Sequence, residues 1–251
     1  MGKAQQNQVE QWPVLTSGTL NLVLADKNGF VIAADSRMSS KALFNCKGKR
    51  QSYCDDSQKL FRTSPDSAMV IAGFAVGSRN TPLDLTVASV LRKDFGRTGW
   101  PADQAHLVSG ALKGELQDAL TGVAALLDPM TSSSALAMTA TLARRDSKGT
   151  PILQQVQFSE SWVPMGPLNR LAPQYTATVY DEVLVTTRFY FVPVGITFVA
   201  EAIREGIYKS ADPVIRNYYD CLKTASCADM SVAEMADLAR VTLRETKNLP
   251  I

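Results

Sequence analysis

Histidine is nearly missing from this chain, which has one, His106, among 251 residues. Zinc sites with several histidines, HExxH metalloproteases and most Ser-His-Asp hydrolases each need an imidazole at a defined position. His106 lies in an amphipathic stretch with Ala105, Val108 and Leu112 near helical spacing, which favours an ordinary helix residue. If the chain is an enzyme, we therefore expect its general base not to be imidazole.

Several other features are absent, and each absence excludes a class of protein. No apolar run approaches the roughly 18 residues that a membrane span needs, so we expect no membrane partner. The net charge of +2, from 26 Lys and Arg against 24 Asp and Glu, is too balanced for a protein that binds nucleic acid by neutralising many phosphates. The patterns GxxxxGK[ST], GxGxxG and GxSxG do not occur. We expect no organic cofactor and no metal ion.

The composition is that of an ordinary globular protein, with 45% hydrophobic and 20% charged residues. The length allows one large domain or two modest ones, given about 100–200 residues per domain. Residues 1–18 are polar and rich in Gln, and we interpret them as a leader or propeptide. We expect the remainder, residues 19–251, to form one domain.

The four cysteines fall into two local pairs, Cys46 with Cys54 and Cys221 with Cys227. Neither pair has the spacing of a zinc site. Two disulfides and an oxidising compartment would explain them, and free buried thiols would explain them equally well. The first 18 residues contain no apolar signal-peptide core, so we expect a cytoplasmic protein. The alternative is a secreted or periplasmic protein whose signal peptide has been removed.

The N-terminal part of the chain has the pattern of β-hairpins. Residues 19–26 alternate apolar and polar positions, turn at Asn28-Gly29, and resume as an apolar run over residues 30–34, which predicts a hairpin. Residues 38–58 contain a basic cluster followed by two aspartates, and we interpret them as an exposed loop. Residues 59–63 and 67–76 are predicted to form two further strands.

Beyond these strands, helices and strands alternate in blocks. We predict helices over 81–95 and 101–127, strands over 133–146, 151–162 and 182–193, and C-terminal helices over 198–208, after Asp212-Pro213, and after the capping box of Ser231 and Glu234. Residues 163–181 have no periodicity that predicts an element. This order favours an α+β fold in which antiparallel sheets are layered against helix pairs.

Four features of the first hairpins could carry chemistry: Gly18-Thr19 opens the first strand, Asp35 closes the second, Lys59 enters the third and Gly73 ends the fourth. Their order resembles the proteasome β-subunit family, including its bacterial relatives, within the N-terminal nucleophile (Ntn) hydrolases. The segment GTLNLVLADKNGFVIAADSR aligns without a gap with the family's cleavage-site glycine, catalytic threonine and Asp-Ser-Arg. QKLFRT resembles its lysine strand, and MVIAGFA resembles its glycine strand.

This resemblance implies a four-layer αββα sandwich and a catalytic set of Thr19, Asp35, Lys59 and Gly73. It also implies that the precursor cuts itself between Gly18 and Thr19, that the substrate is a peptide or protein, and that the chain self-associates into a ring or stacked rings. Each of these is an expectation from the resemblance, because no compositional feature indicates them.

The chemistry explains why these residue types are needed. A threonine hydroxyl is a weak nucleophile, and the α-amine of Thr19, once free, can take its proton because an α-amine titrates near pH 8. A Lys59 ammonium beside them would lower the pKa of the amine and the hydroxyl, and Asp35 would hold that lysine charged. The backbone N–H of Gly73 would be an oxyanion donor, which is typically worth about 3–4 kcal/mol.

Two departures from the family pattern count against activity. The family's Gly-Ser-Gly corresponds here to 195–197, so an activating serine is replaced by Ile196. The family's aspartate-serine element after the late helix has no counterpart before the chain stops at Ile251. Three alternatives stay open. In the first, Asp35 caps a turn and Lys59 is a solvated strand residue. In the second, the chain is a catalytically silent proteasome-like subunit that serves as an assembly or binding module, and in the third it is an unrelated α+β binding protein.

Overall fold

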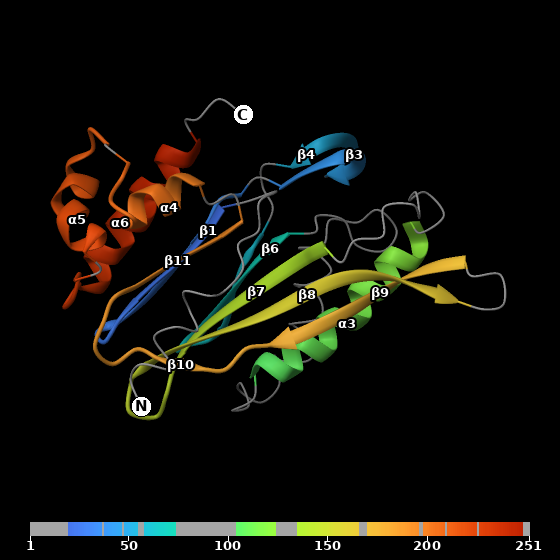
Figure 1. The fold of residues 1–251 in the computed structure, drawn as a ribbon, viewed down its shortest axis with the longest axis horizontal. Coiled ribbons are helices and arrows are strands. Elements are labelled where there is room, and N and C mark those ends of the chain that lie inside the picture. Colours follow the sequence, from blue (N-terminus) through green and yellow to red (C-terminus); the bar gives the residue numbers. More distant parts are fainter. Residues whose placement is uncertain are drawn as a thin grey trace.

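Figure 1 presents the computed structural model of the protein. The structure describes residues 20–36, 38–46, 48–54, 58–73, 104–123, 135–165, 170–195, 198–208, 210–224 and 226–247. The fold is mixed α+β, and every strand pairing among these residues is antiparallel. The predicted helix over 81–95 lies outside the described residues.

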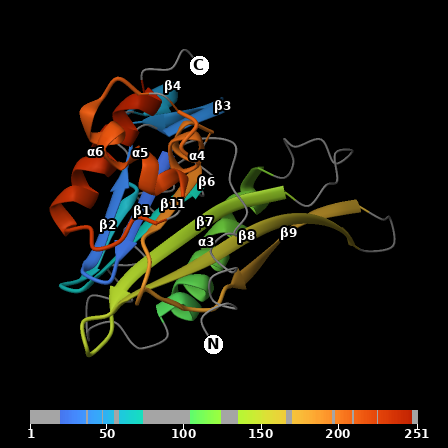
Figure 2. The ribbon, with the colours of Figure 1, turned by 60° about the vertical axis from the view of Figure 1, so that its left-hand side comes forward.

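The first sheet has three strands in the order β11-β1-β2, namely β11 (Tyr190–Gly195), β1 (Leu20–Asp26) and β2 (Gly29–Ala34). The predicted hairpin of β1 and β2 is confirmed. Helices α4 (Phe198–Arg204), α5 (Pro213–Lys223) and α6 (Val232–Lys247) cover one face of this sheet (Figures 1 and 2).

The second sheet has the order β10-β8-β7-β6-β5, and β9 pairs with β8. Its strands are β5 (Leu60–Ser64), β6 (Ser67–Gly73), β7 (Ala135–Arg145), β8 (Pro151–Met165), β9 (Arg170–Val179) and β10 (Val183–Leu184). Helix α3 (Gln104–Val123), predicted over 101–127, packs on one face of this sheet through its buried Ala105, Val108 and Leu112. His106 lies on the exposed side of α3, as its helical spacing predicted.

The alternation of side chains in β1 explains why apolar groups pack on both faces of the first sheet. Leu20, Leu22 and Leu24 face α4–α6, whereas Val23 and Ala25 join an apolar cluster with residues of β6, β7, β8 and β11. All five are at most 1% exposed. Because complete burial of an aliphatic side chain contributes about 1.5–3 kcal/mol, β1 is fixed firmly between the helices and the second sheet.

Three predictions about strands are wrong. Residues 38–58 contain a hairpin of β3 (Met38–Cys46) and β4 (Lys49–Cys54), whose turn includes Gly48 at φ +82°. Residues 163–181 contain the end of β8 and all of β9. Pro173 obscures the strand pattern of β9, but it is tolerated there because β9 lies outside β8 and pairs with it alone among the described strands. The strand expected over 182–193 is divided into β10 and β11 by exposed residues.

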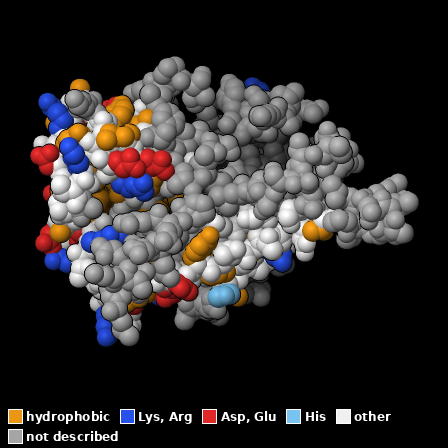
Figure 3. Space-filling model, viewed as in Figure 1, with side chains coloured by type: hydrophobic (Ala, Val, Ile, Leu, Met, Phe, Trp, Pro, Cys, Tyr) orange, Lys and Arg blue, Asp and Glu red, His pale blue; other side chains and the backbone are white. Residues whose placement is uncertain are grey.

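The predicted starts of the C-terminal helices are confirmed by their side chains. The Asp212 carboxylate accepts a hydrogen bond from Val214 N at 2.9 Å, and Pro213 is the first residue of α5. Ser231 Oγ accepts from Glu234 N at 3.2 Å while Glu234 Oε2 accepts from Ser231 N at 2.8 Å, which is a capping box. Basic and acidic side chains intermingle over this helical part of the surface, at the left of Figure 3. None of the helices in the described ranges is both long and apolar enough to cross a bilayer.

Candidate active site

The first component of the site is Asp35, which follows β2 directly. The hairpin register pairs Asn21 with Ala34, so Asp35 lies beside Leu20. Asp35 N donates to Leu20 O, and Leu20 N donates to Asp35 Oδ2, each at 3.1 Å. The carboxylate is therefore bound to the backbone nitrogen to which Thr19 is attached.

The second component, Lys59, comes from the other sheet, one residue before β5. Its carbonyl oxygen accepts a hydrogen bond from Ile71 N of β6 at 3.1 Å. Its Nζ lies 2.6 Å from Asp35 Oδ1. The side chain of Lys59 is 4% exposed and that of Asp35 is 38% exposed, so the ammonium is dry while water reaches the carboxylate.

Burial decides between the two interpretations of Lys59 that the sequence left open. Removing an ammonium from water costs several kcal/mol unless a carboxylate and other polar groups compensate. Lysine is almost never fully buried unless it is paired. The interpretation of Lys59 as a solvated strand residue is therefore wrong, and the carboxylate of Asp35 is its ion-pair partner. This contact joins residues that are 24 positions apart in the sequence.

Two glycines at this end of the sheets have conformations that favour glycine. Gly73 ends β6 with φ +124°, and Gly195 ends β11 with φ +107°. Gly195 is the register partner of Leu20, and Gly73 is two residues along β6 from Ile71. Residues with a Cβ are strained in this region of φ, so glycine is the residue that favours these two backbone conformations.

Sequence reasoning missed Asn21, a buried residue that links the two sheets. Its side chain is on the face of β1 that carries Val23 and Ala25, and the residue is 0% exposed. Asn21 Nδ2 donates to Ile71 O at 2.5 Å, whereas Oδ1 has no partner among the described residues. The available signal was an amide on the same face of the strand as the apolar Val23 and Ala25, which indicates that this face is also buried.

The structure thus brings together two of the predicted site residues, Asp35 and Lys59, and places Gly73 on the strand next to the lysine. The predicted nucleophile Thr19 and the cleavage-site Gly18 lie outside the described residues, as does Ile196. The interpretation of Asp35 as a simple turn cap omits its strongest contact, the 2.6 Å ion pair.

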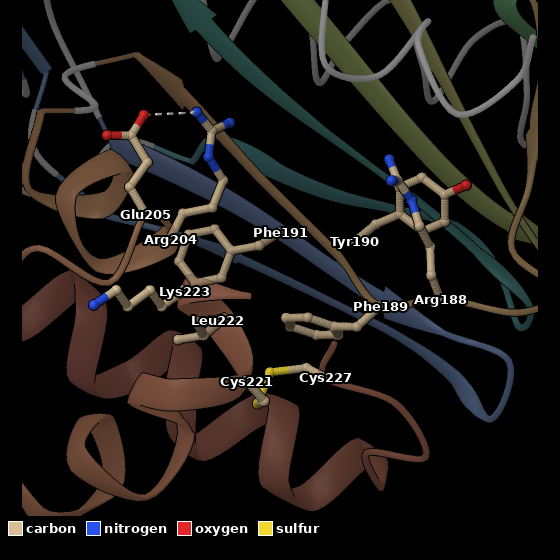
Figure 4. A pocket seen from close by; sticks show the side chains of 10 residues that line it. All are labelled: Arg188, Phe189, Tyr190, Phe191, Arg204, Glu205, Cys221, Leu222, Lys223 and Cys227. Atoms are coloured by element: carbon tan, nitrogen blue, oxygen red, sulfur yellow. Dashed lines mark ion pairs between the residues drawn. A yellow bond between two sulfur atoms is a disulfide. The ribbon is translucent and has the colours of Figure 1, made fainter. Parts of the chain in front are cut away.

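A cavity of about 320 Å³ lies at the opposite end of β1 (Figure 4). Its lining includes Phe189, Phe191, Arg204, Glu205 and the disulfide between Cys221 and Cys227. Tyr190, another lining residue, pairs with Ala25, five residues along β1 from Leu20, which is about 17 Å in a strand. Asp35, Lys59 and Gly73, the predicted site residues that the structure describes, do not line this cavity, and its cysteine sulfurs are joined to each other.

The other cysteines, Cys46 and Cys54, belong to β3 and β4 and are not register partners, since Cys46 pairs with Lys49 and Cys54 with Met38. Their bonding stays a prediction, because the structure does not describe their side chains. Within the described ranges, no group of three or more His, Cys, Asp or Glu side chains is arranged to hold a metal ion.

Comparison with known proteins leaves the site to be interpreted from its geometry. No protein-family model matches the chain, and no curated protein matches it.

Proposed function

We propose that the chain is an N-terminal threonine hydrolase, which cleaves peptide or other amide bonds once residues 1–18 have been removed. One observation carries the proposal. The buried Lys59 ammonium lies 2.6 Å from the Asp35 carboxylate, whose second oxygen holds the backbone nitrogen that follows Thr19. A free α-amine and a hydroxyl at position 19 would therefore be tethered beside a fixed positive charge.

In the proposed reaction, Thr19 Oγ forms a bond to the substrate carbonyl carbon while its proton passes to the free α-amine of the same residue. The carbonyl π electrons move onto oxygen, toward the N–H of Gly73 as the proposed oxyanion donor. Collapse of the adduct breaks the C–N bond, and the leaving amine takes the proton from the α-ammonium. Water then attacks the carbonyl carbon of the ester and gives a proton to the α-amine. The C–Oγ bond breaks as Oγ takes this proton back from the α-ammonium, which releases the acid and restores the threonine hydroxyl.

Lys59 contributes to this reaction through charge. An isolated ammonium about 4 Å from a developing negative charge would stabilise it by about 4 kcal/mol at an effective dielectric constant near 20, and the Asp35 carboxylate paired with Lys59 reduces that value. The dry surroundings of Lys59 preserve this effect, because water is kept from screening the ammonium. Asp35 is needed because it stabilises the ammonium at a buried position.

We propose that the fold which carries this site is the four-layer αββα sandwich of the Ntn hydrolases. Three apolar clusters support this arrangement. One joins α3 to the second sheet, one joins the two sheets, and one joins the first sheet to α4–α6. We also propose that the chain self-associates into rings, an expectation that comes from the resemblance alone and that sedimentation velocity would test.

The test of the hydrolase is the intact mass of the purified full-length chain. We expect wild type and Thr19→Ser to lose residues 1–18, because both keep a hydroxyl at position 19, and Thr19→Ala to keep them. Lys59→Ala should also stay unprocessed. Processed protein should then cleave fluorogenic peptides and lose this activity to a threonine-directed electrophile. A full-length wild type under all conditions would refute self-cleavage and favour the silent assembly subunit.

A further inference from the structure

Asn21 forms a side-chain bond between the sheets at the candidate site. It extends from β1 in the first sheet to the carbonyl oxygen of Ile71 in β6 of the second sheet, at 2.5 Å. The same Ile71 donates its N–H to the carbonyl oxygen of Lys59. The Asn21 amide is thus two hydrogen bonds away from the backbone of the buried lysine.

These contacts close into a ring. From Asn21 the ring runs to Ile71, then to the main chain of Lys59, along the lysine side chain to Asp35, and from Asp35 Oδ2 back to the N–H of Leu20, the neighbour of Asn21. Two of its links cross between the sheets: the Asn21 amide to Ile71, and the Lys59 ammonium to Asp35. These two links add to the apolar packing between the sheets and restrict both their separation and their rotation at this end.

We infer that Asn21 is a positioning residue for the Lys59 ammonium: its amide holds β1 against β6 so that Nζ stays on Asp35 beside position 19. This inference deepens the proposed hydrolase, on which its catalytic meaning rests, but the positioning itself is a property of the described residues. The neighbouring side chains on this face, Val23 and Ala25, have no donor that could replace the amide.

The choice of an amide at this position is otherwise unfavourable. Asn21 is 0% exposed, and its Oδ1 has no partner among the described residues, so the side chain is buried with only half of its polar groups satisfied. Replacement by an apolar side chain would remove that unsatisfied oxygen, but it would also leave Ile71 O without this donor. The geometry therefore assigns Asn21 to the alignment of the two strands rather than to core packing.

The experiment measures how fast Lys59 reacts with an amine-acylating N-hydroxysuccinimide ester at pH 8, read by peptide mass spectrometry. Lys27, whose side chain is 53% exposed, is the internal reference in the same chain. Asn21→Leu keeps the side-chain size and removes the hydrogen-bond donor. If this variant does not fold, the Lys59 rate is measured in Asn21→Ala instead. Val23→Ala is the matched control, because it removes buried volume from the same face of β1 and keeps the amide.

We expect Asn21→Leu to raise the Lys59 rate, relative to Lys27, by about tenfold or more through local opening of the ion pair. Val23→Ala should not raise it beyond what its measured unfolding free energy explains. Self-processing, followed separately by intact mass, should slow in Asn21→Leu and not in Val23→Ala.

The two readouts separate the two ideas. The positioning role is overturned if the Lys59 rate in both Asn21 variants stays at the wild-type value or rises only as much as in Val23→Ala. This conclusion holds whether or not the chain processes itself. The Lys59 rate could rise in Asn21→Leu and not in Val23→Ala while the wild-type chain never loses residues 1–18. That result would support the positioning role and refute the proposed hydrolase.

Discussion

The two ends of β1 carry the same kind of ion pair in opposite surroundings. Near Leu20, Lys59 pairs with Asp35 through a lysine side chain that is 4% exposed. At the turn after Asp26, Lys27 pairs with Asp229, and these side chains are 53% and 66% exposed. The exposed pair loses most of its attraction to solvent screening and to side-chain entropy. The buried pair must be kept intact, because Lys59 without Asp35 would be a desolvated charge.

The other polar contacts at the two ends follow the same division. At the far end, Arg145 Nη2 donates to Asn28 O at 3.2 Å, and Asn28 Nδ2 donates to Met230 O at 3.3 Å. These bonds fasten the β1–β2 turn to β7 and to the start of α6 through exposed or partly buried groups. At the near end, Asn21 and Lys59 are themselves buried. The near end is therefore held by buried polar groups, and the turn at the far end is held by exposed or partly buried ones.

Removing each lysine tests this comparison with the largest expected effect. Lys59→Ala should lower the free energy of unfolding by about 2–3 kcal/mol, because it removes a charged hydrogen bond and the packing of the lysine stem, while water reaches the Asp35 carboxylate that remains. Lys27→Ala should leave it nearly unchanged, because the pair with Asp229 is exposed and solvent screens it. Urea titration monitored by circular dichroism measures both values.

Salt sharpens the same test. Raising the ionic strength should reduce the small contribution of Lys27 and leave that of Lys59 nearly unchanged, because buried pairs are screened less. Equal losses in the two alanine variants, or equal sensitivity to salt, would contradict the distinction between the two ends.

The disulfide of Cys221 and Cys227 belongs to the far end, where it lines the cavity of Figure 4. It closes a short loop between α5 and the segment before α6, with a Cα–Cα distance of 4.7 Å. Replacing both cysteines with serine should lower the free energy of unfolding by about 2 kcal/mol, the chain-entropy value for so short a loop. The rate of Lys59 acylation in the folded state should stay at the wild-type value. A faster Lys59 rate in this variant would show that the two ends of β1 are coupled.

Backbone conformation gives the next test of the near end. Gly195 has φ +107° opposite Leu20, so Gly195→Ala should lower the free energy of unfolding by at least about 1 kcal/mol. Gly110 in α3 is the control, because an added Cβ meets nothing within 4 Å there and helical alanine is favoured over glycine. The melting temperature should therefore fall in Gly195→Ala and rise in Gly110→Ala.

Local patterns predicted much of this molecule because their causes are local. The β1–β2 hairpin, the Asp212 cap and the Ser231–Glu234 box each depend on residues within a few positions of one another. The β9 strand could not be predicted, since its identity depends on pairing with β8 and not on an alternation of its own. The contact of Asp35 with Lys59 joins two sheets, so spacing alone could not reveal it, and only the resemblance placed these residues in one site.

The far end also supplies the smallest expected effect, at the start of α6. Glu234 accepts hydrogen bonds from Ser231 Oγ, Ser231 N and Tyr218 Oη, and these bonds hold the pKa of its carboxyl below the ordinary value. A carboxyl whose pKa is lower in the folded chain than in the unfolded chain stabilises the fold at pH values above the unfolded pKa. That contribution is lost as the pH falls from about 4.3 through the folded value.

We therefore expect the free energy of unfolding to fall less steeply below about pH 4.3 in Glu234→Gln than in wild type. Glutamine still satisfies a capping box, so this variant removes the titration while it keeps the hydrogen bonds to Ser231. Urea titrations of both proteins between pH 3 and pH 7 measure the difference in slope. The remaining acid sensitivity belongs to carboxyls such as Asp212 and Asp146, whose pKa values backbone hydrogen bonds also lower, and it should be the same in both proteins. Identical slopes would show that folding does not lower the pKa of the Glu234 carboxyl, and they would contradict this prediction.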